Sequence, residues 1–307
     1  MTVPAQREKV RFDSGDSDCA AWYYPGTNRA CVVMAGGMAV TKEPGTDPFA
    51  RRFHEAGFTV LAFDYRHLGE SGGQPRQVVS IRRHLADWDA ALAHASAVPG
   101  VDPARVAIWG FSSSGGLVLD VAARHPGVAA AIAQTPLADG QAATRNALRH
   151  QRPLATLRLT GRGVRDALGG LRGREPVLVA LDGTPGTVAV LTTPDAVDSV
   201  ALDPDGRYAD WTRAVAARSA LRIGFYRPGR RASRVGVPLL VVVCDQDQSA
   251  LAGPAVRAAE RAPRGELVRL TGGHYAPFAA EHERAVEAEL SFLRRHLLSG
   301  PRAPAAE

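Results

Sequence analysis

A run of three serines followed by two glycines is the strongest chemical signal in the sequence. It lies in WGFSSSGG, Trp109 to Gly116, after an apolar run that predicts a buried strand and before one that predicts a helix. A nucleophilic serine is often held at such a sharp strand-to-helix turn, where small neighbours let the two backbones approach. The common pattern is G-x-S-x-G, and this sequence matches it with Gly110 and Ser112 but has Ser114 in the last position.

Two alternatives to Ser112 stay open. Ser114 is the nucleophile if the motif begins at Ser112, but that choice carries the strand two residues further and places the turn inside the glycines. An ordinary helix start is the other alternative, because serines often cap helices. We favour Ser112 because it fits the strand–turn–helix context best.

A serine hydroxyl needs a base to take its proton, and the base needs an orienting partner. His274 follows a predicted strand directly, in the turn TGGHYAP. In parallel sheets the loops after the strands gather at the active edge, so His274 is the candidate base. Four other histidines fall on helical patterns and are expected at the surface: His84, His94, His282 and His296.

The candidate acid lies in VVVCDQDQ, which ends an apolar strand and offers Asp245 and Asp247. We favour Asp247, because it lies deeper in the loop and is better placed to turn towards a histidine on the next loop. Either carboxylate could also be merely solvated at the end of the strand. Ser112, Asp247 and His274 then occur in the chain order Ser…Asp…His, which is typical of one large class of α/β enzymes.

The oxyanion that develops during acyl transfer needs preorganised N–H donors. One candidate is the amide of Ser113, at the predicted helix start. The other is the amide of Met38 in VMAGGMAV, where Gly36 and Gly37 allow close approach of the backbone. An ordinary glycine-rich loop is the alternative.

Strand and helix patterns alternate around these residues. Apolar runs predict strands at 10–13, 20–25, 31–35, 58–65, 105–110, 128–134, 237–243 and 266–270. Helical spacing predicts helices at 48–56, 81–97, from about 115, at 253–261 and at 282–298. The alternation predicts an α/β protein with a mostly parallel central sheet and helices on both faces.

The alternation of strand and helix patterns ends after about residue 136. We therefore predict a core formed by residues 1–136 and 234–299, a lid inserted at 137–233, and a disordered tail at 300–307. Within the insertion, two apolar runs around a Gly/Pro turn at 177–191 predict a hairpin. A helical pattern covers about 208–221.

Composition narrows the function classes. The net charge is +6, yet Lys9 and Lys42 are the only lysines, so the charge comes from arginines scattered along the chain. No zinc-finger spacing, arginine-rich tail or RNA-binding aromatic motif accompanies them, so we expect no nucleic-acid partner. The polar N-terminus and the lack of a long apolar run predict neither a secretory signal nor membrane association.

The three cysteines, Cys19, Cys31 and Cys244, are far apart, which favours a reducing cytoplasm over a disulfide framework. Metal-ligand clusters, HExxH and a complete P-loop are all missing from the sequence, so we expect no cofactor and no metal.

Five stretches resemble one family: VVMAGGMAVTKEPGTDPFARRF, DYRHLGESGGQPRQ, WGFSSSGG, TTPDA and VPLLVVVCDQDQ. The sequence is similar to bacterial α/β hydrolases of the dienelactone-hydrolase and acyl-peptidase-like type, including lid-bearing hydrolases and acyl transferases of polyketide pathways. The resemblance implies the α/β-hydrolase fold and a serine hydrolase with Ser112, Asp247 and His274 as its triad. Two positions depart from the family pattern. Gly36 replaces the usual histidine of the oxyanion loop, and Ser113 replaces the usual aromatic residue after the nucleophile.

We therefore expect hydrolysis of an ester or thioester through an acyl-enzyme on Ser112. The acyl substrate is a small molecule, free or bound to a carrier protein. The alternatives are acyl transfer, lyase or cyclase chemistry on the same fold, and ligand binding without catalysis. The sequence leaves the oligomeric state open, with a homodimer among the alternatives.

Overall fold

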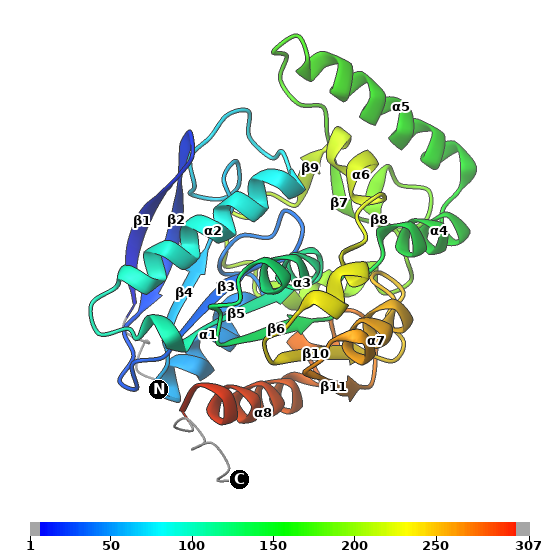
Figure 1. Cartoon of the computed structure of the whole chain (residues 1–307). Helices are drawn as coiled ribbons and strands as arrows, with labels where there is room; N and C mark the ends of the chain where they lie inside the picture. Colours follow the sequence, from blue (N-terminus) through cyan, green and yellow to red (C-terminus); the bar gives the residue numbers. More distant parts are fainter. Residues whose placement is uncertain (1–6, 299–307) are drawn as a thin grey trace.

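The computed structural model describes residues 7–298, and an eight-stranded sheet forms its centre (Figure 1). The strand order is β1-β2-β4-β3-β5-β6-β10-β11. The strands are Glu8–Ser14 (β1), Ser17–Tyr24 (β2), Cys31–Ala35 (β3), Thr59–Phe63 (β4), Val106–Phe111 (β5), Ala130–Gln134 (β6), Leu239–Cys244 (β10) and Gly265–Leu270 (β11). β2 is antiparallel to β1 and β4, and the other neighbouring pairs are parallel. The predicted mostly parallel sheet is confirmed.

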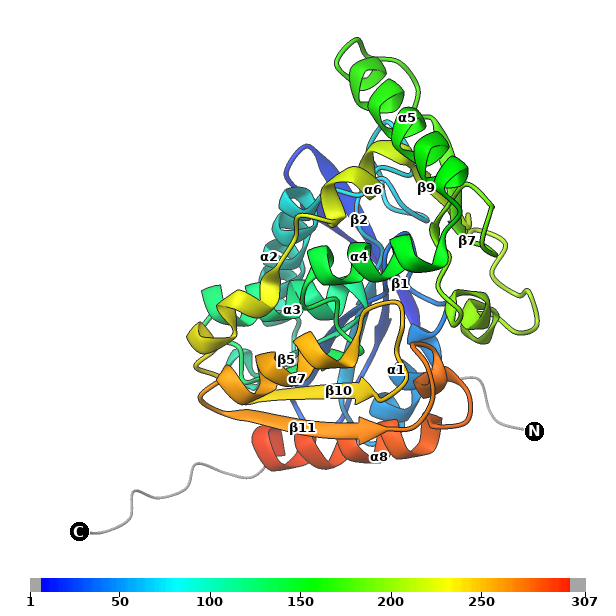
Figure 2. The same cartoon turned by 90° about the vertical axis from the view of Figure 1, so that its right-hand side faces the viewer.

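Helices cover both faces of this sheet, as predicted. α8 lies below β10 and β11 in Figure 2, with α1 beside it. On the opposite face, α7 packs on β10 and β11, and α3 packs on β5 and β6. α2 packs next to α3. The long helices of the core are Thr46–Glu55 (α1), Ile81–Ala97 (α2), Ser113–Arg124 (α3), Ala252–Arg261 (α7) and His282–Leu293 (α8). Short helical turns are Pro103–Arg105 (η1), Ala276–Phe278 (η4) and Arg294–Leu298 (η5).

Burial explains why the central strands are almost wholly apolar. Every residue of β3, β4, β5, β6 and β10 is buried, because helices cover both faces of the sheet at these strands. The edge strand β11 instead alternates between exposed and partly buried positions along most of its length. The three cysteines are free and buried in this core.

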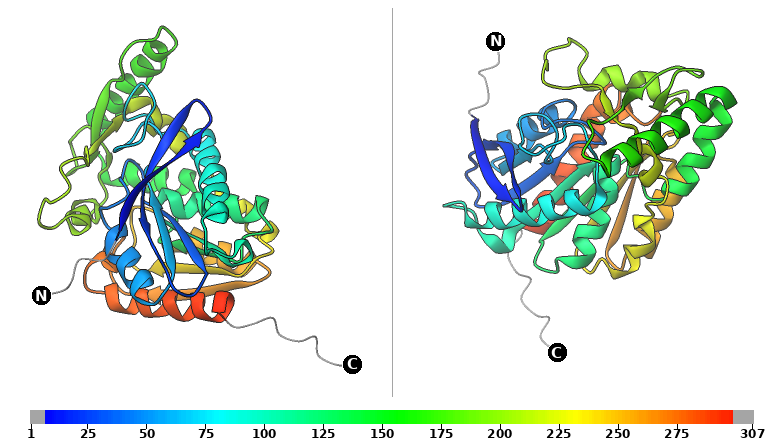
Figure 3. Two further views of the ribbon diagram at one scale, coloured as in Figure 1. Left: turned by 90° about the vertical axis from the view of Figure 1, so that its left-hand side faces the viewer. Right: turned by 90° about the horizontal axis from the view of Figure 1, so that it is seen from above.

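A long insertion separates β6 from β10, which are neighbours in the sheet. It contains Gly140–His150 (α4), Pro153–Gly170 (α5), Leu178–Asp182 (β7), Ala189–Leu191 (β8), Ala196–Leu202 (η2), Ala214–Ala216 (β9), Ala217–Ile223 (α6) and Pro228–Arg234 (η3). A second, three-stranded sheet with the order β8-β7-β9 lies inside it. Figures 1 and 3 show α5 as its outermost helix, whereas η3 packs on α3 and α7 of the core.

The structure corrects three local predictions. β7 and β8 do not form a hairpin, because they pair in parallel and the antiparallel partner of β7 is β9. The helix expected at about 208–221 is confined to α6, and β9 precedes it directly. His84 is not at the surface, because the residue is 3% exposed and its ring stacks on the ring of Tyr65 at a centroid distance of 3.9 Å.

The termini lie outside the described residues, and so does the tail predicted to be disordered at 300–307. Among residues 7–298, none of the helices combines the length and the apolar character that crossing a bilayer requires.

Candidate active site

Ser112 lies at a sharp turn between β5 and α3. Its backbone has φ 57° and ψ −117°, a strained conformation for a residue with a side chain. The crossing of strand and helix is tight, because a Cβ on Gly110 would lie 2.5 Å from the carbonyl oxygen of Ser114. A Cβ on Gly116 would lie 2.6 Å from the carbonyl oxygen of Leu137. The glycines are therefore required for this turn, which exposes the side chain of Ser112 to a cavity.

The structure brings Ser112, His274 and Asp247 into one hydrogen-bonded chain. His274 Nε2 lies 2.9 Å from Ser112 Oγ, and His274 Nδ1 lies 2.7 Å from Asp247 Oδ2. His274 and Asp247 are 1% and 4% exposed, so the pair is shielded from water. With its proton on Nδ1, the imidazole donates to Asp247 and offers Nε2 to the serine hydroxyl.

The two candidate acids, Asp245 and Asp247, differ in their contacts. Asp247 Oδ1 accepts hydrogen bonds from the amides of Ala250, at 2.7 Å, and Leu251, at 3.3 Å. Asp245 is exposed and forms an ion pair with Arg269 at 2.6 Å. Of these two acids, only Asp247 therefore contacts the imidazole of His274.

Burial and nearby charge act in opposite directions on His274. Burial alone would lower its pKa, because the charged imidazolium loses its hydration. The charge and hydrogen bond of Asp247, together with the charge of Asp195, outweigh burial and raise the pKa of His274 above its ordinary value. The site therefore favours an imidazolium once His274 has taken a proton.

The predicted oxyanion donors, the amides of Met38 and Ser113, belong to residues near Ser112. Both residues line the cavity beside Ser112. Ser113 is the first residue of α3, where helical geometry leaves the amide without an intrahelical acceptor. A Cβ on Gly37 would lie 3.4 Å from Ser112 Cβ, so the loop that carries Met38 runs close to the serine.

Ser114 is fully buried and braces this loop. Its hydroxyl donates to the carbonyl oxygen of Gly36. Tyr65 Oη lies 2.6 Å from Ser114 Oγ, and Trp88 Nε1 donates to Tyr65 Oη at 2.8 Å. The Trp88 indole can thus donate to the Tyr65 hydroxyl, which can donate to the Ser114 hydroxyl, which donates to the carbonyl oxygen of Gly36. A Cβ on Gly36 would lie 3.0 Å from the carbonyl oxygens of Val40 and Thr41, so a side chain at this position would require the loop to shift by a few tenths of an ångström.

A largely apolar cavity of about 160 Å³ opens from Ser112 into the insertion. Its lining from the insertion includes Leu137, Ala143, Ala147, Leu148, Leu159, Leu181, Ala189, Val190, Leu191, Ala220 and Ile223. The described residues that line the cavity include no lysine, arginine, aspartate or glutamate. A groove between α4, α5 and α6 adjoins the cavity, because Thr144, Leu148, Thr156, Leu159 and Ala220 line both.

The family model described as "Serine aminopeptidase, S33" matches residues 26–273, most of the chain. The chain belongs to this family of hydrolases. A curated relative matches nearly the full length of the chain. The quorum-quenching protein AidA of Acinetobacter baumannii is 39% identical over 298 residues, which cover 95% of this chain and 96% of AidA.

Other relatives of this S33-family chain are named polyketide transferases or thiohydrolases. The polyketide transferase GrgF of a Penicillium species is 31% identical over 189 residues, 61% of this chain and 60% of GrgF. The thiohydrolase AneE of Aspergillus aculeatus is 35% identical over 115 residues, 38% of this chain and 36% of AneE. The crystal structure of GrgF superposes with a TM-score of 0.80 at 24% identity, covering 95% of this chain and 99% of that one, which confirms the α/β-hydrolase fold.

Asp195 lies beside the candidate triad of this S33-family chain, and the sequence analysis did not select it. It belongs to the insertion, and it is buried beside the loops that carry Asp247 and His274. Burial would raise its pKa, but hydrogen bonds from Gln248 and Ser249 and the charge of His274 hold the pKa below its ordinary value. Its segment, TTPDA, is one of the stretches that carry the family resemblance, and this was the available signal.

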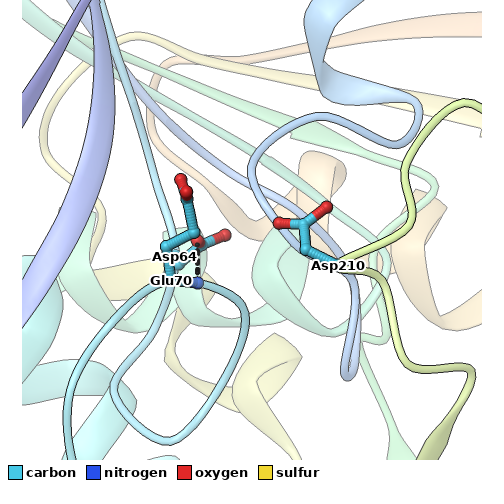
Figure 4. A group of neighbouring side chains, drawn as sticks. All are labelled: Asp64, Glu70 and Asp210. Atoms are coloured by element: carbon cyan, nitrogen blue, oxygen red, sulfur yellow. Dashed lines mark hydrogen bonds between the residues drawn. The ribbon is translucent and has the colours of Figure 1, made fainter.

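A second group of carboxylates lies away from the cavity. Figure 4 shows Asp64, Glu70 and Asp210, whose oxygens come within 4.8 Å of one another. The ammonium of Lys42 already donates to Asp64 at 2.9 Å and to Glu70 at 2.7 Å. Hydrogen bonds from Lys42 and Lys9 lower the pKa of Glu70 to about 2. Because Lys42 supplies the positive charge, these carboxylates do not indicate a metal site.

Proposed function

We propose that this protein hydrolyses an ester or thioester of an apolar acyl group through an acyl-enzyme on Ser112. The observation that carries the proposal is the position of the His274 imidazole, which lies between Ser112 Oγ at 2.9 Å and Asp247 Oδ2 at 2.7 Å. A nucleophile, a base and an orienting acid in mutual contact are the parts that acyl transfer requires.

In the first half of the proposed reaction, Ser112 Oγ attacks the substrate carbonyl carbon and its proton passes to His274 Nε2. The carbonyl π electrons move to oxygen, and the amides of Met38 and Ser113 stabilise that oxyanion. When the tetrahedral intermediate collapses, the bond to the leaving group breaks. The imidazolium then protonates the departing alcohol or thiol, which leaves the acyl group esterified to Ser112.

In the second half, His274 takes a proton from water, and the resulting hydroxide attacks the acyl-enzyme carbonyl. Collapse of this intermediate breaks the bond to Ser112 Oγ, and His274 returns the proton to the serine. The products are a free acid and the original hydroxyl. Throughout, Asp247 holds the imidazole by its Nδ1–H and stabilises the imidazolium.

The cavity wall supports an apolar, uncharged acyl group as the substrate. Its described side chains come largely from aliphatic residues, and a charged acyl chain would lose hydration there without gaining a partner. We propose that the insertion acts as the lid that shapes this cavity. The donor is a small-molecule ester or thioester, with a carrier-protein-bound thioester as the alternative.

Acyl transfer is the second candidate. The insertion lines much of the cavity with apolar side chains, and limited access of water to the acyl-enzyme favours another acceptor. The relatives named polyketide transferases also support this candidate.

The test is turnover of an acyl-thioester series from acetyl to decanoyl on N-acetylcysteamine, with Ser112→Ala as the control. We expect release of free acid and thiol by the wild type and a loss of activity of at least about 10³-fold in Ser112→Ala. Adding alcohol or amine acceptors distinguishes the candidates, because a transferase would produce the ester or amide in place of the acid. Equal rates for wild type and Ser112→Ala would refute both.

A further inference from the structure

Asp195 connects three parts of the chain at the back of the proposed triad. Its Oδ2 accepts hydrogen bonds from the backbone amides of Gln248 at 2.8 Å, Ser249 at 3.3 Å and His274 at 3.2 Å. Its Oδ1 accepts from the hydroxyl of Ser249 at 2.9 Å. The donors belong to the loops after β10 and β11, whereas Asp195 itself belongs to the insertion.

We propose that Asp195 is a positioning residue, which holds the loop of Asp247 and the loop of His274 in the relative placement that catalysis needs. This inference rests on the proposed function of Ser112, Asp247 and His274. It also assigns the insertion a second role. Besides lining the cavity, the insertion supplies the carboxylate that joins the two catalytic loops.

The chemistry of the donors explains why a carboxylate is needed. Three backbone amides and one hydroxyl converge on Asp195, and an ionised carboxylate accepts up to about four hydrogen bonds without donating any. An asparagine of the same size would turn its NH2 group towards at least one of these donors, so the network would lose acceptors at a buried position. Asp195 is only 6% exposed, so water cannot easily replace the lost acceptors.

The fit around Asp195 is close on the histidine side. A Cβ on Gly273 would lie 2.9 Å from the Cβ of Asp195, so a side chain at position 273 would push the two segments apart. Thr193, two residues before Asp195, also lies 2.8 Å from Ser249 through its hydroxyl. The insertion is thus joined to the acid loop by two side chains.

Asp195 is not a spare catalytic acid. Its oxygens bind backbone amides and the hydroxyl of Ser249, and its contact with His274 is to the backbone amide, whereas the ring nitrogens contact Asp247 and Ser112. It is also absent from the described residues that line the cavity. Its removal should therefore change the rate of the reaction more than the binding of substrate.

The negative charge of Asp195 gives the test a second readout. The groups that face His274 are the carboxylates of Asp247 and Asp195, the hydroxyl of Ser112, and the rings of Phe111 and Tyr275. Two anions thus favour the imidazolium, and both raise the pKa of His274. Without the charge of Asp195, the acidic limb of kcat/KM should move to lower pH, a change that loosened packing alone would not produce.

The experiment compares Asp195→Asn with the matched variant Asp198→Asn in the full chain. Asp198 is an exposed residue of the short helix η2, which begins directly after Asp195, so its replacement controls for the change of charge in this segment. Ester turnover, its pH profile, the rate of fluorophosphonate labelling at Ser112 and thermal denaturation are measured for each. Ser249→Ala, which removes one donor to Asp195 and keeps the charge, provides a milder variant if Asp195→Asn does not fold.

For Asp195→Asn we expect kcat to fall by about 10- to 100-fold, with KM changed little and the acidic limb shifted to lower pH. For Ser249→Ala we expect a smaller fall in kcat and an unmoved limb. Asp198→Asn should match the wild type. The inference is overturned if the wild type is labelled and folded Asp195→Asn keeps both its kcat and its acidic limb. If Asp195→Asn does not fold, the inference is overturned when the kcat of Ser249→Ala equals that of Asp198→Asn. Absence of labelling in the wild type would instead refute the proposed function.

Discussion

In the candidate site, burial and nearby negative charge both act on the imidazole of His274. Its ring lies against Phe111 and Tyr275, with centroid distances of 5.2 Å and 4.9 Å, and Asp247 holds one of its nitrogens. The aromatic walls keep the ring in one orientation and limit the access of water. The negative charge of Asp247 then stabilises the protonated form of the buried ring.

A pH profile of kcat/KM follows from this balance. Catalysis needs neutral His274, and the pKa of His274 is raised above its ordinary value of 6.5. Activity should therefore rise with pH and reach half of its plateau above pH 6.5. Ester turnover measured between about pH 5 and about pH 9 checks this expectation. A midpoint below 6.5 would show that the two nearby carboxylates do not control the ring.

Ser114 gives a second prediction at the residue scale. Ser114→Ala should reduce kcat/KM by about 10-fold, because the loop that presents the Met38 amide loses its brace at Gly36. Tyr65→Phe removes a donor to Ser114, and it should have a smaller effect that does not add to that of Ser114→Ala. Steady-state kinetics of the two single variants and the double variant provide the check. Complete loss of activity in Ser114→Ala, with activity kept in Ser112→Ala, would make Ser114 the nucleophile.

Sequence reasoning selected Ser112, Asp247 and His274, and the structure brings these three side chains together; their catalytic role stays a prediction. Each lies in the loop or turn after a strand of the parallel sheet, so local pattern and the geometry of parallel sheets were sufficient to select them. Asp195 and the role of Ser114 could not be found in the same way. Their partners lie far away in the chain, at Gln248 and at Gly36, and no periodic pattern indicates such contacts.

At the scale of elements, the core was largely predictable and the insertion was not. Helix α2 has the predicted bounds, and the strands of the parallel sheet lie where continuous apolar runs predicted them. The second sheet differs from expectation because the pairing of β7, β8 and β9 depends on which segments meet in space. Its short strands carry too little pattern to choose between a hairpin and a parallel pair.

The insertion should control the length of acyl chain that the site accepts. Ala220 of α6 lines both the cavity and the groove that adjoins it. Ala220→Phe should therefore slow turnover of decanoyl thioesters by about 10-fold or more, while acetyl thioesters, which do not reach this position, keep their rate. Kinetics over the chain-length series measure the effect, and the acetyl substrate is the internal control. An equal loss on all chain lengths would place the acyl group elsewhere.

At the scale of the whole molecule, a buried acid below the sheet links stability to pH. Glu289 of α8 is fully buried, and its Oε2 accepts a hydrogen bond from Trp109 Nε1 of β5 at 3.0 Å. Burial raises the pKa of Glu289 well above its ordinary value of 4.5, against the smaller opposing effect of the Trp109 hydrogen bond. The folded protein therefore keeps this carboxyl protonated at pH values where the unfolded chain releases the proton.

Stability should consequently fall as the pH rises from 4.5 through the raised pKa of Glu289, because only the unfolded state ionises freely in that window. Glu289→Gln removes the titrating group, and its Tm relative to the wild type should increase with pH, by roughly 2 °C or more at alkaline pH. Glu287→Gln, at an exposed position of the same helix, is the matched control. A Tm difference between Glu289→Gln and wild type that does not change with pH would contradict the assignment.

The measurement that tests the central claim most directly is covalent labelling with a fluorophosphonate, followed by intact mass and peptide mapping. We expect one adduct per chain, on Ser112, and its loss in His274→Ala, because only a serine activated by the buried imidazole reacts quickly. An adduct on Ser114 would contradict the assignment of the nucleophile. No adduct on the folded wild-type protein would contradict the account of Ser112 as an activated nucleophile.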